Sequence, residues 1–271
     1  EGTMLEREEI TAGMRVMAVA RDGGNVQRAH TSFGDRRGYG TVLDREKDVE
    51  DVVRHVRELL SAPKVKGGPR TVILDPMLAG VFVHEAFGHL SESDFIYENP
   101  QARDMMKLGR RFGPDFLNVV DDGSIAGDNG YIGYDDEGVP KCTTYLIRNG
   151  ILSGRLHSRE TAGIMGEKPT GNARAISASY SPIVRMTGTF IEPGGTSFEE
   201  MLSTVDDGVY GCVFLGGMTG LEQFTFSSNY AYRIENGKIT TPVRDVILSG
   251  NVFETLARVA AVGDDLKLHG G

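Results

Sequence analysis

The sequence has 271 residues, with 29 basic against 38 acidic side chains and a formal net charge of −9. This charge argues against a general nucleic-acid-binding surface or an anionic-membrane surface. The length corresponds to one large domain or two smaller ones. We find no signal peptide and no apolar run near the ~20 residues of a membrane span. Cys142 and Cys212 are too few for a disulfide framework, which fits a reducing cytoplasm.

The first part of the chain is predicted to combine a β-hairpin with helices. Residues 14–21 and 25–33 are predicted strands around Asp22-Gly23-Gly24. Residues 46–60 have apolar side chains at helical spacing, which predicts an amphipathic helix. His55 lies on the polar side of that helix, so we expect it to be solvated.

A short strand at 71–75 precedes a helical segment at 77–90 that begins after Pro76. Residues 98–113 are polar and predict a loop or loose helix, whose basic side chains are expected to face solvent. From Phe116 onward the pattern is mainly that of strands, with two Asn-Gly hairpin signals and helices at 158–165 and 251–261. The predicted strands are 116–121, 142–148, 151–156, 183–191, 209–215, 222–227, 229–235, 238–241 and 243–248.

These elements predict an α+β fold. Residues 1–113 form an α/β part that carries the histidine motif on a distorted helix. Residues 114–271 form a β-rich part of mixed sheets that is partly closed and barrel-like. We expect the two parts to pack as one unit, because the composition changes only weakly near residue 114.

The most informative motif is His84-Glu85-Ala86-Phe87-Gly88-His89. Metal-binding histidines on a regular helix stand at i and i+4, about 40° apart at ~3.6 residues per turn. Here the second histidine is at i+5, about 140° away on the same geometry. A π-bulge would bring both rings to one face, and Gly88 would permit a break or an unusual backbone angle. We therefore predict a distorted helix between Glu85 and His89.

This residue set is suited to zinc hydrolysis. Zinc accepts imidazole nitrogen, and a catalytic site usually adds a third protein ligand and a water. Glu85 adjoins the first histidine and is placed to take a proton from water at the metal and to return it later. The alternative is that His84 and His89 are ordinary core histidines.

The third ligand is not evident from the pattern. Cys212 is a soft ligand, but it lies in an apolar strand, which favours a buried structural cysteine over a metal ligand. His157 follows a predicted strand at a turn and is a candidate site residue. Glu92 and Asp94 lie just beyond the motif, where each is a possible partner of a histidine N–H, a possible ligand of a substrate amine, or part of an exposed acidic turn.

With these residues in view, the sequence resembles the TldD/PmbA family, and specifically its TldD-type metalloprotease subunit. The likeness covers roughly residues 30 to 268. It is carried by ordered segments that read HEAFGH followed by ESDF, VVDDGSIAGDNGYIGYDDEGVP, KPTGNARA, RMTGTFIEPG, YRIENGKITTPVRDVILSGN and VAAVGDDLKL.

The resemblance implies a cytoplasmic zinc peptidase that acts on peptides or unfolded chains. It assigns His84 and His89 as metal ligands and Glu85 as the general base. It also implies a dimer, either with a paralogous subunit that lacks the HExxxH motif or with a second copy. In the family the third ligand is a cysteine shortly after the segment GDDLKLHGG, so we expect it beyond residue 271. A preceding α/β region of the family is expected ahead of Glu1.

Two other functions remain open at the level of sequence. One is a non-catalytic peptide-binding or assembly subunit of a two-subunit protease complex. The other is a metal-dependent hydrolase of a non-peptide amide, since the water chemistry would be the same.

Overall fold

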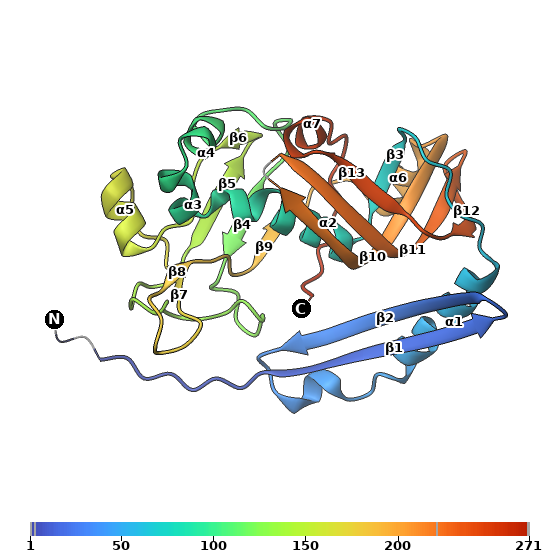
Figure 1. Ribbon diagram of the computed structural model, residues 1–271, viewed down its shortest axis with the longest axis horizontal. Helices are drawn as coiled ribbons and strands as arrows, with labels where there is room; N and C mark the ends of the chain where they lie inside the picture. Colours follow the sequence, from blue (N-terminus) through green and yellow to red (C-terminus); the bar gives the residue numbers. More distant parts are fainter. Residues whose placement is uncertain (1, 3, 221, 270–271) are drawn as a thin grey trace. The chain divides into compact units, whose positions relative to one another are not determined.

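The computed structural model describes Gly2, residues 4–220 and residues 222–269. Within them the chain has an α+β fold rich in strands, which confirms the predicted fold class (Figure 1). The chain divides into two compact units: residues 1–10, 82–192 and 251–260 form unit 1, and residues 11–81, 193–250 and 261–271 form unit 2. The composition change near residue 114 lies inside unit 1. No helix in the described ranges is long and apolar enough to cross a bilayer.

Unit 2 is built on a five-stranded mixed sheet and a separate two-stranded hairpin. The order in the larger sheet is β12-β11-β10-β3, with β13 also paired to β11. β10 runs parallel to β3 and antiparallel to β11. The strands of unit 2 are β1 (Ala12–Asp22), β2 (Asn25–Asp35), β3 (Thr71–Leu74), β10 (Asp207–Gly220), β11 (Gln223–Glu235), β12 (Lys238–Val243) and β13 (Ile247–Asn251).

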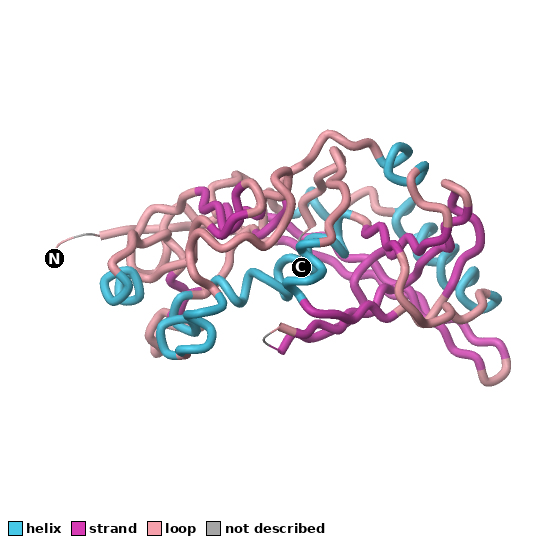
Figure 2. The backbone as a smooth tube through the Cα atoms, turned by 90° about the horizontal axis from the view of Figure 1, so that it is seen from above, coloured by secondary structure: helices cyan, strands magenta, loops and turns pink. Residues whose placement is uncertain are grey.

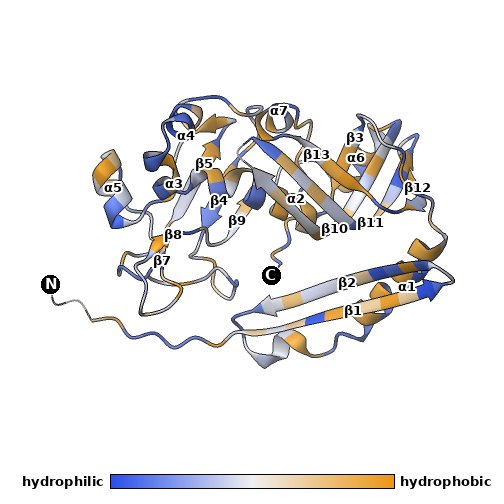
Figure 3. Cartoon of the chain, viewed as in Figure 1, coloured by the Kyte–Doolittle hydropathy of each residue, from blue (hydrophilic) through white to orange (hydrophobic). Residues whose placement is uncertain are grey.

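Helix α1 (Glu46–Ser61) lies against the β1-β2 hairpin, as its periodicity predicts. Val52 and Val56 pack with Ala29 of β2 in a small core, and Figure 3 shows hydrophobic and hydrophilic stretches side by side on α1. The expectation that His55 is solvated is wrong. Its ring is buried and stacks on Tyr230 with centroids 3.8 Å apart. The other helical elements of unit 2 are η1 (Tyr39–Val42), most of α2 (Pro76–Val83) and α6 (Phe198–Ser203).

Unit 1 contains an antiparallel sheet in the order β6-β5-β4-β9 and a short β7-β8 pair, joined by the long loops drawn in pink in Figure 2. Its strands are β4 (Val119–Asp122), β5 (Thr143–Arg148), β6 (Ile151–Leu152), β7 (Ala173–Arg174), β8 (Ile183–Val184) and β9 (Thr189–Ile191). Its helices are η2 (His84–Gly88), η3 (His89–Ser91), α3 (Ser93–Glu98), α4 (Pro100–Met105), α5 (Arg159–Met165) and α7 (Val252–Ala257).

Three details of the strand prediction are corrected. The predicted strand 183–191 is two short strands, because between them the backbone N–H of Thr187 donates to the side-chain carboxylate of Asp121 and not to a neighbouring strand. The predicted strands 222–227 and 229–235 are one continuous strand, β11. The expected partly closed, barrel-like arrangement is not found: no sheet formed by the described residues closes on itself.

Candidate metal centre

The histidine motif lies on one helical segment that changes its winding at the motif. Pro76 opens α2, and the carboxylate of Asp75 accepts a hydrogen bond from the backbone N–H of Leu78 at 2.7 Å, which caps the helix start. At His84 the helix widens into the π-helical turn η2, in which the N–H of His89 donates to the carbonyl of His84. This i to i+5 bond adds one residue to the turn. The predicted distortion of the helix is therefore present.

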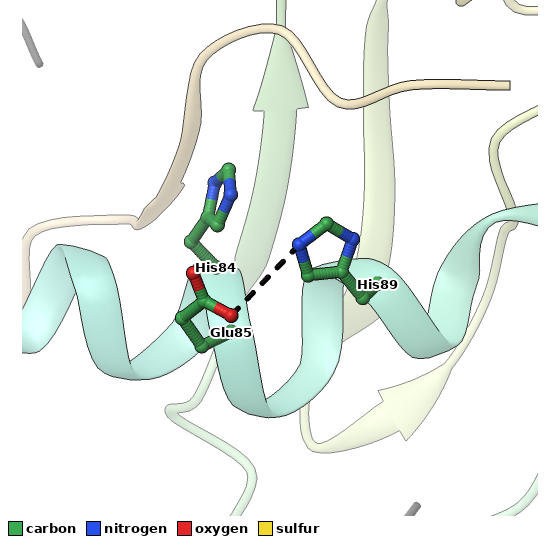
Figure 4. Close-up of side chains that lie close together, drawn as sticks. All are labelled: His84, Glu85 and His89. Carbon is green, nitrogen blue, oxygen red and sulfur yellow. Dashed lines mark ion pairs between the residues drawn. The ribbon is translucent and has the colours of Figure 1, made fainter. Parts of the chain in front are cut away.

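The wider turn brings His84, Glu85 and His89 together. Their imidazole nitrogens and carboxylate oxygen all lie within 4.8 Å of one another, and they form the one such group of three among the residues that the structure describes. The centroids of the two imidazole rings are 5.2 Å apart, and the ring planes meet at 83°. His89 Nε2 is 3.9 Å from Glu85 Oε2, the pair marked by the dashed line in Figure 4.

These distances fit a metal ion after small side-chain rotations. Donors bonded to a tetrahedral zinc at ~2.0–2.1 Å stand roughly 3.3 Å apart, so the separations of up to 4.8 Å seen here would have to shorten by up to about 1.5 Å. The two imidazoles are donors that zinc accepts, and Glu85 adds a carboxylate beside them. The side chains present therefore fit the metal that the sequence implies.

The pKa values of the two histidines are shifted in opposite directions. Burial lowers the pKa of His84, and the neighbouring His89 lowers it further. His84 is therefore held in the neutral form that binds metals. The hydrogen bond that His89 donates to Glu92 raises the pKa of His89, against the effect of burial. Because Nδ1 of His89 is hydrogen-bonded to Glu92, Nε2 is the nitrogen of His89 that remains free to bind a metal.

Gly88 has a different role from the one expected. Its backbone is regular, with φ −58° and ψ −49°, so no unusual angle requires glycine. A Cβ at this position would instead lie 2.0 Å from the sulfur of Met186, which is buried against the turn. Gly88 therefore makes room for Met186, a contact that no local pattern signals.

Glu92 and Asp94 lie on either side of Ser93 and face different partners. Glu92 Oε2 lies 3.2 Å from His89 Nδ1, and Glu92 Oε1 lies 3.5 Å from a guanidinium nitrogen of Arg185. Asp94 instead accepts hydrogen bonds from the backbone of Val184 at 2.9 Å and of its neighbour Phe95. The structure brings Glu92 to the motif, and it uses Asp94 to hold β8 against α3.

His157 and the cysteines lie outside the group of three. His157 is 1% exposed, with Nε2 3.1 Å from Glu167 and Nδ1 3.1 Å from Thr161, and burial lowers its pKa. Cys212 is buried in β10, where burial raises the pKa of its thiol. Cys142 is exposed in unit 1. The cysteine ligand expected beyond residue 271 lies outside the described residues.

Sequence reasoning did not find Arg185. It lies in the segment RMTG, about a hundred residues from the motif, and no spacing rule links the two. Only the folded chain shows that it faces Glu92.

Comparison with known proteins places the sequence near metalloproteases. Residues 67–271 match the profile of the PmbA/TldA metallopeptidase C-terminal domain. A Synechocystis protein named a metalloprotease is 50% identical over 265 residues, which cover 98% of this chain and 57% of that protein. A Saccharolobus solfataricus protein named a zinc metalloprotease TldD homolog is 32% identical over 98% of this chain and 61% of its own length.

The fold recurs in a solved structure. The crystal structure of TldE from Thermococcus kodakarensis matches with a TM-score of 0.78 and 23% identity, over 94% of this chain and 57% of that one. This chain therefore spans somewhat more than half the length of the proteins it resembles.

Proposed function

This chain belongs to the PmbA/TldD metallopeptidase family, and on that premise we propose that it is a zinc-dependent metallopeptidase that hydrolyses peptides or unfolded polypeptides. His84 and His89 hold the metal, and Glu85 is the general base. The observation that carries the proposal is the convergence of these three side chains within 4.8 Å on a π-helical turn.

The roles follow from the positions of the side chains. Zinc, when bound, supplies a Lewis acid that polarises a peptide carbonyl and makes water more acidic. His84 is kept neutral by burial, and His89 turns Nε2 toward the same space. The carboxylate of Glu85 lies within 4.8 Å of a nitrogen of each ring (Figure 4), so it can take a proton from water there and return it to the leaving amine.

The proposal includes parts of the protein beyond these residues. The third ligand is a cysteine that follows residue 271. The partner is a paralogous family subunit or a second copy of this chain, as the family resemblance implies. We place the protein in the cytoplasm because the two cysteines within these 271 residues, Cys142 and Cys212, are both free.

The test is Glu85→Gln in the complete gene product, with Glu160→Gln on the exposed start of α5 as the matched control. Glu85→Gln should retain metal and lose about 10²- to 10⁴-fold in peptide hydrolysis, because it keeps the shape but removes the base. The control should match the parent protein. Unchanged hydrolysis by Glu85→Gln with metal bound would refute the general-base role. Stoichiometric zinc without hydrolysis of any peptide by the parent protein would favour a non-catalytic subunit.

A further inference from the structure

Glu92 is a carboxylate side chain that is almost completely buried. Its exposed fraction is 7%, and its two oxygens have different surroundings. Oε2 lies 3.2 Å from His89 Nδ1. Oε1 is buried without a hydrogen-bond partner, and the Arg185 guanidinium lies 3.5 Å from it. A buried carboxylate with an unsatisfied oxygen costs free energy, which makes a purely structural role a poor explanation.

The backbone holds Glu92 and Arg185 in place independently of their side chains. The residues on either side of Glu92 are tied to one strand-like segment, since Ser93 N donates to Leu156 O at 3.1 Å and Leu156 N donates to Ser91 O at 2.9 Å. Arg185 N donates to Asn172 O at 2.8 Å. The backbone at Glu92 and at Arg185 is therefore held by hydrogen bonds that do not involve the two side chains.

We propose that Glu92 and Arg185 form a positioning pair for the metal ligand His89. Glu92 accepts the Nδ1–H of His89, which selects the tautomer with a free Nε2 and sets the angle of the ring. Arg185 balances the buried charge of Glu92 and keeps its second oxygen from turning away. A carboxylate behind a ligating histidine commonly raises metal affinity in this way. The inference rests on the proposed metal site, and it adds two residues that act on the metal only through His89.

The test measures zinc affinity by competition with a chromophoric chelator in the complete gene product, so that catalysis is not the readout. Glu92→Gln should weaken zinc binding by about 10- to 100-fold. Arg185→Met should weaken it by a smaller factor, and Arg185→Lys should restore most of the loss because it keeps the charge. The matched controls are Glu98→Gln on the exposed side of α3 and Arg174→Met in β7, and both should bind zinc as the parent protein does.

A second measurement separates a positioning role from a purely structural one. If Glu92 positions His89, the cobalt-substituted Glu92→Gln protein should show a changed visible spectrum, because the His89 ring is no longer held. Equal zinc affinity and an unchanged cobalt spectrum in Glu92→Gln would overturn the inference while leaving the metal site intact. If Glu92→Gln does not fold, equal zinc affinity in Arg185→Met and the parent protein overturns it. Absence of zinc binding in the parent protein itself would instead refute the proposed function.

Discussion

Replacing Gly88 by alanine tests whether glycine is required at this position to leave room for the Met186 side chain. The new Cβ would lie 2.0 Å from Met186 Sδ and 3.2 Å from its Cε, so the thioether must move by roughly 1.5–2 Å to reach an ordinary contact. Overpacking of this kind costs about 1–3 kcal/mol. Alanine at a helical position recovers about 0.5–1 kcal/mol, because the backbone of Gly88 is regular. We expect Gly88→Ala to lower the free energy of unfolding by about 0.5–2 kcal/mol.

Gly88→Ala should no longer lower the free energy of unfolding when the Met186 side chain is removed. Met186→Ala alone should cost about 2–5 kcal/mol as a cavity, since Met186 is buried. In that background Gly88→Ala meets no sulfur and should be neutral or stabilising by up to about 1 kcal/mol. Gly80→Ala in α2 is the matched control, because a Cβ there meets nothing within 4 Å. Denaturant unfolding of the parent protein, Gly88→Ala, Met186→Ala and the double variant gives the coupling energy between the two positions. Equal destabilisation by Gly88→Ala in both backgrounds would refute the steric explanation.

Two further predictions concern unit 1. Burial lowers the pKa of Lys141 to about 8, so the fold disfavours its charged form: the penalty is full below pH 8, is relieved as pH rises toward ~10.4, and is absent above. Unfolding titrations at several pH values should show the free energy of unfolding rise by about 1–2 kcal/mol over this range, after allowance for partial exposure. Lys141→Met should lack this rise. Parallel pH curves for the parent protein and Lys141→Met would contradict the prediction. Asp121 accepts hydrogen bonds from Asn172, from Thr189 and twice from Thr187, all near 2.8 Å. Asp121→Ala should therefore cost at least about 3 kcal/mol, and a loss under 1 kcal/mol would show that water replaces the carboxylate.

The parts of the molecule that were predictable depend on local chemistry. The Asn149-Gly150 and Asn236-Gly237 turns form because these residues accept positive φ, here between 50° and 75°. The periodicity of α1 and the i to i+5 spacing of His84 and His89 led to the helix and to the π-turn. In each case the residues that determine the geometry are neighbours in the sequence.

The parts that were missed depend on distant partners. His55 was assigned to solvent because its own helix is polar there, but Tyr230 covers it from β11. The role of Gly88 requires Met186, and the surroundings of Glu92 require Arg185. A single sequence carries no record of which remote side chain fills such a space, so propensity and spacing cannot supply it.

The parallel pairing of β3 with β10 has a consequence for the order of folding. Gly208 of β10 is paired with Thr71 of β3, so nearly the whole of unit 1 is translated before the central sheet of unit 2 can close. Closing an unstructured loop of that length costs roughly 4 kcal/mol in chain entropy. Within unit 1, however, β9 lies against η2, which places the two ends of the intervening segment near each other once unit 1 has formed. Residues 82–192, which make up most of unit 1, should therefore acquire their structure before β10 is synthesised, and the proximity of their two ends should then shorten the search of β10 for β3.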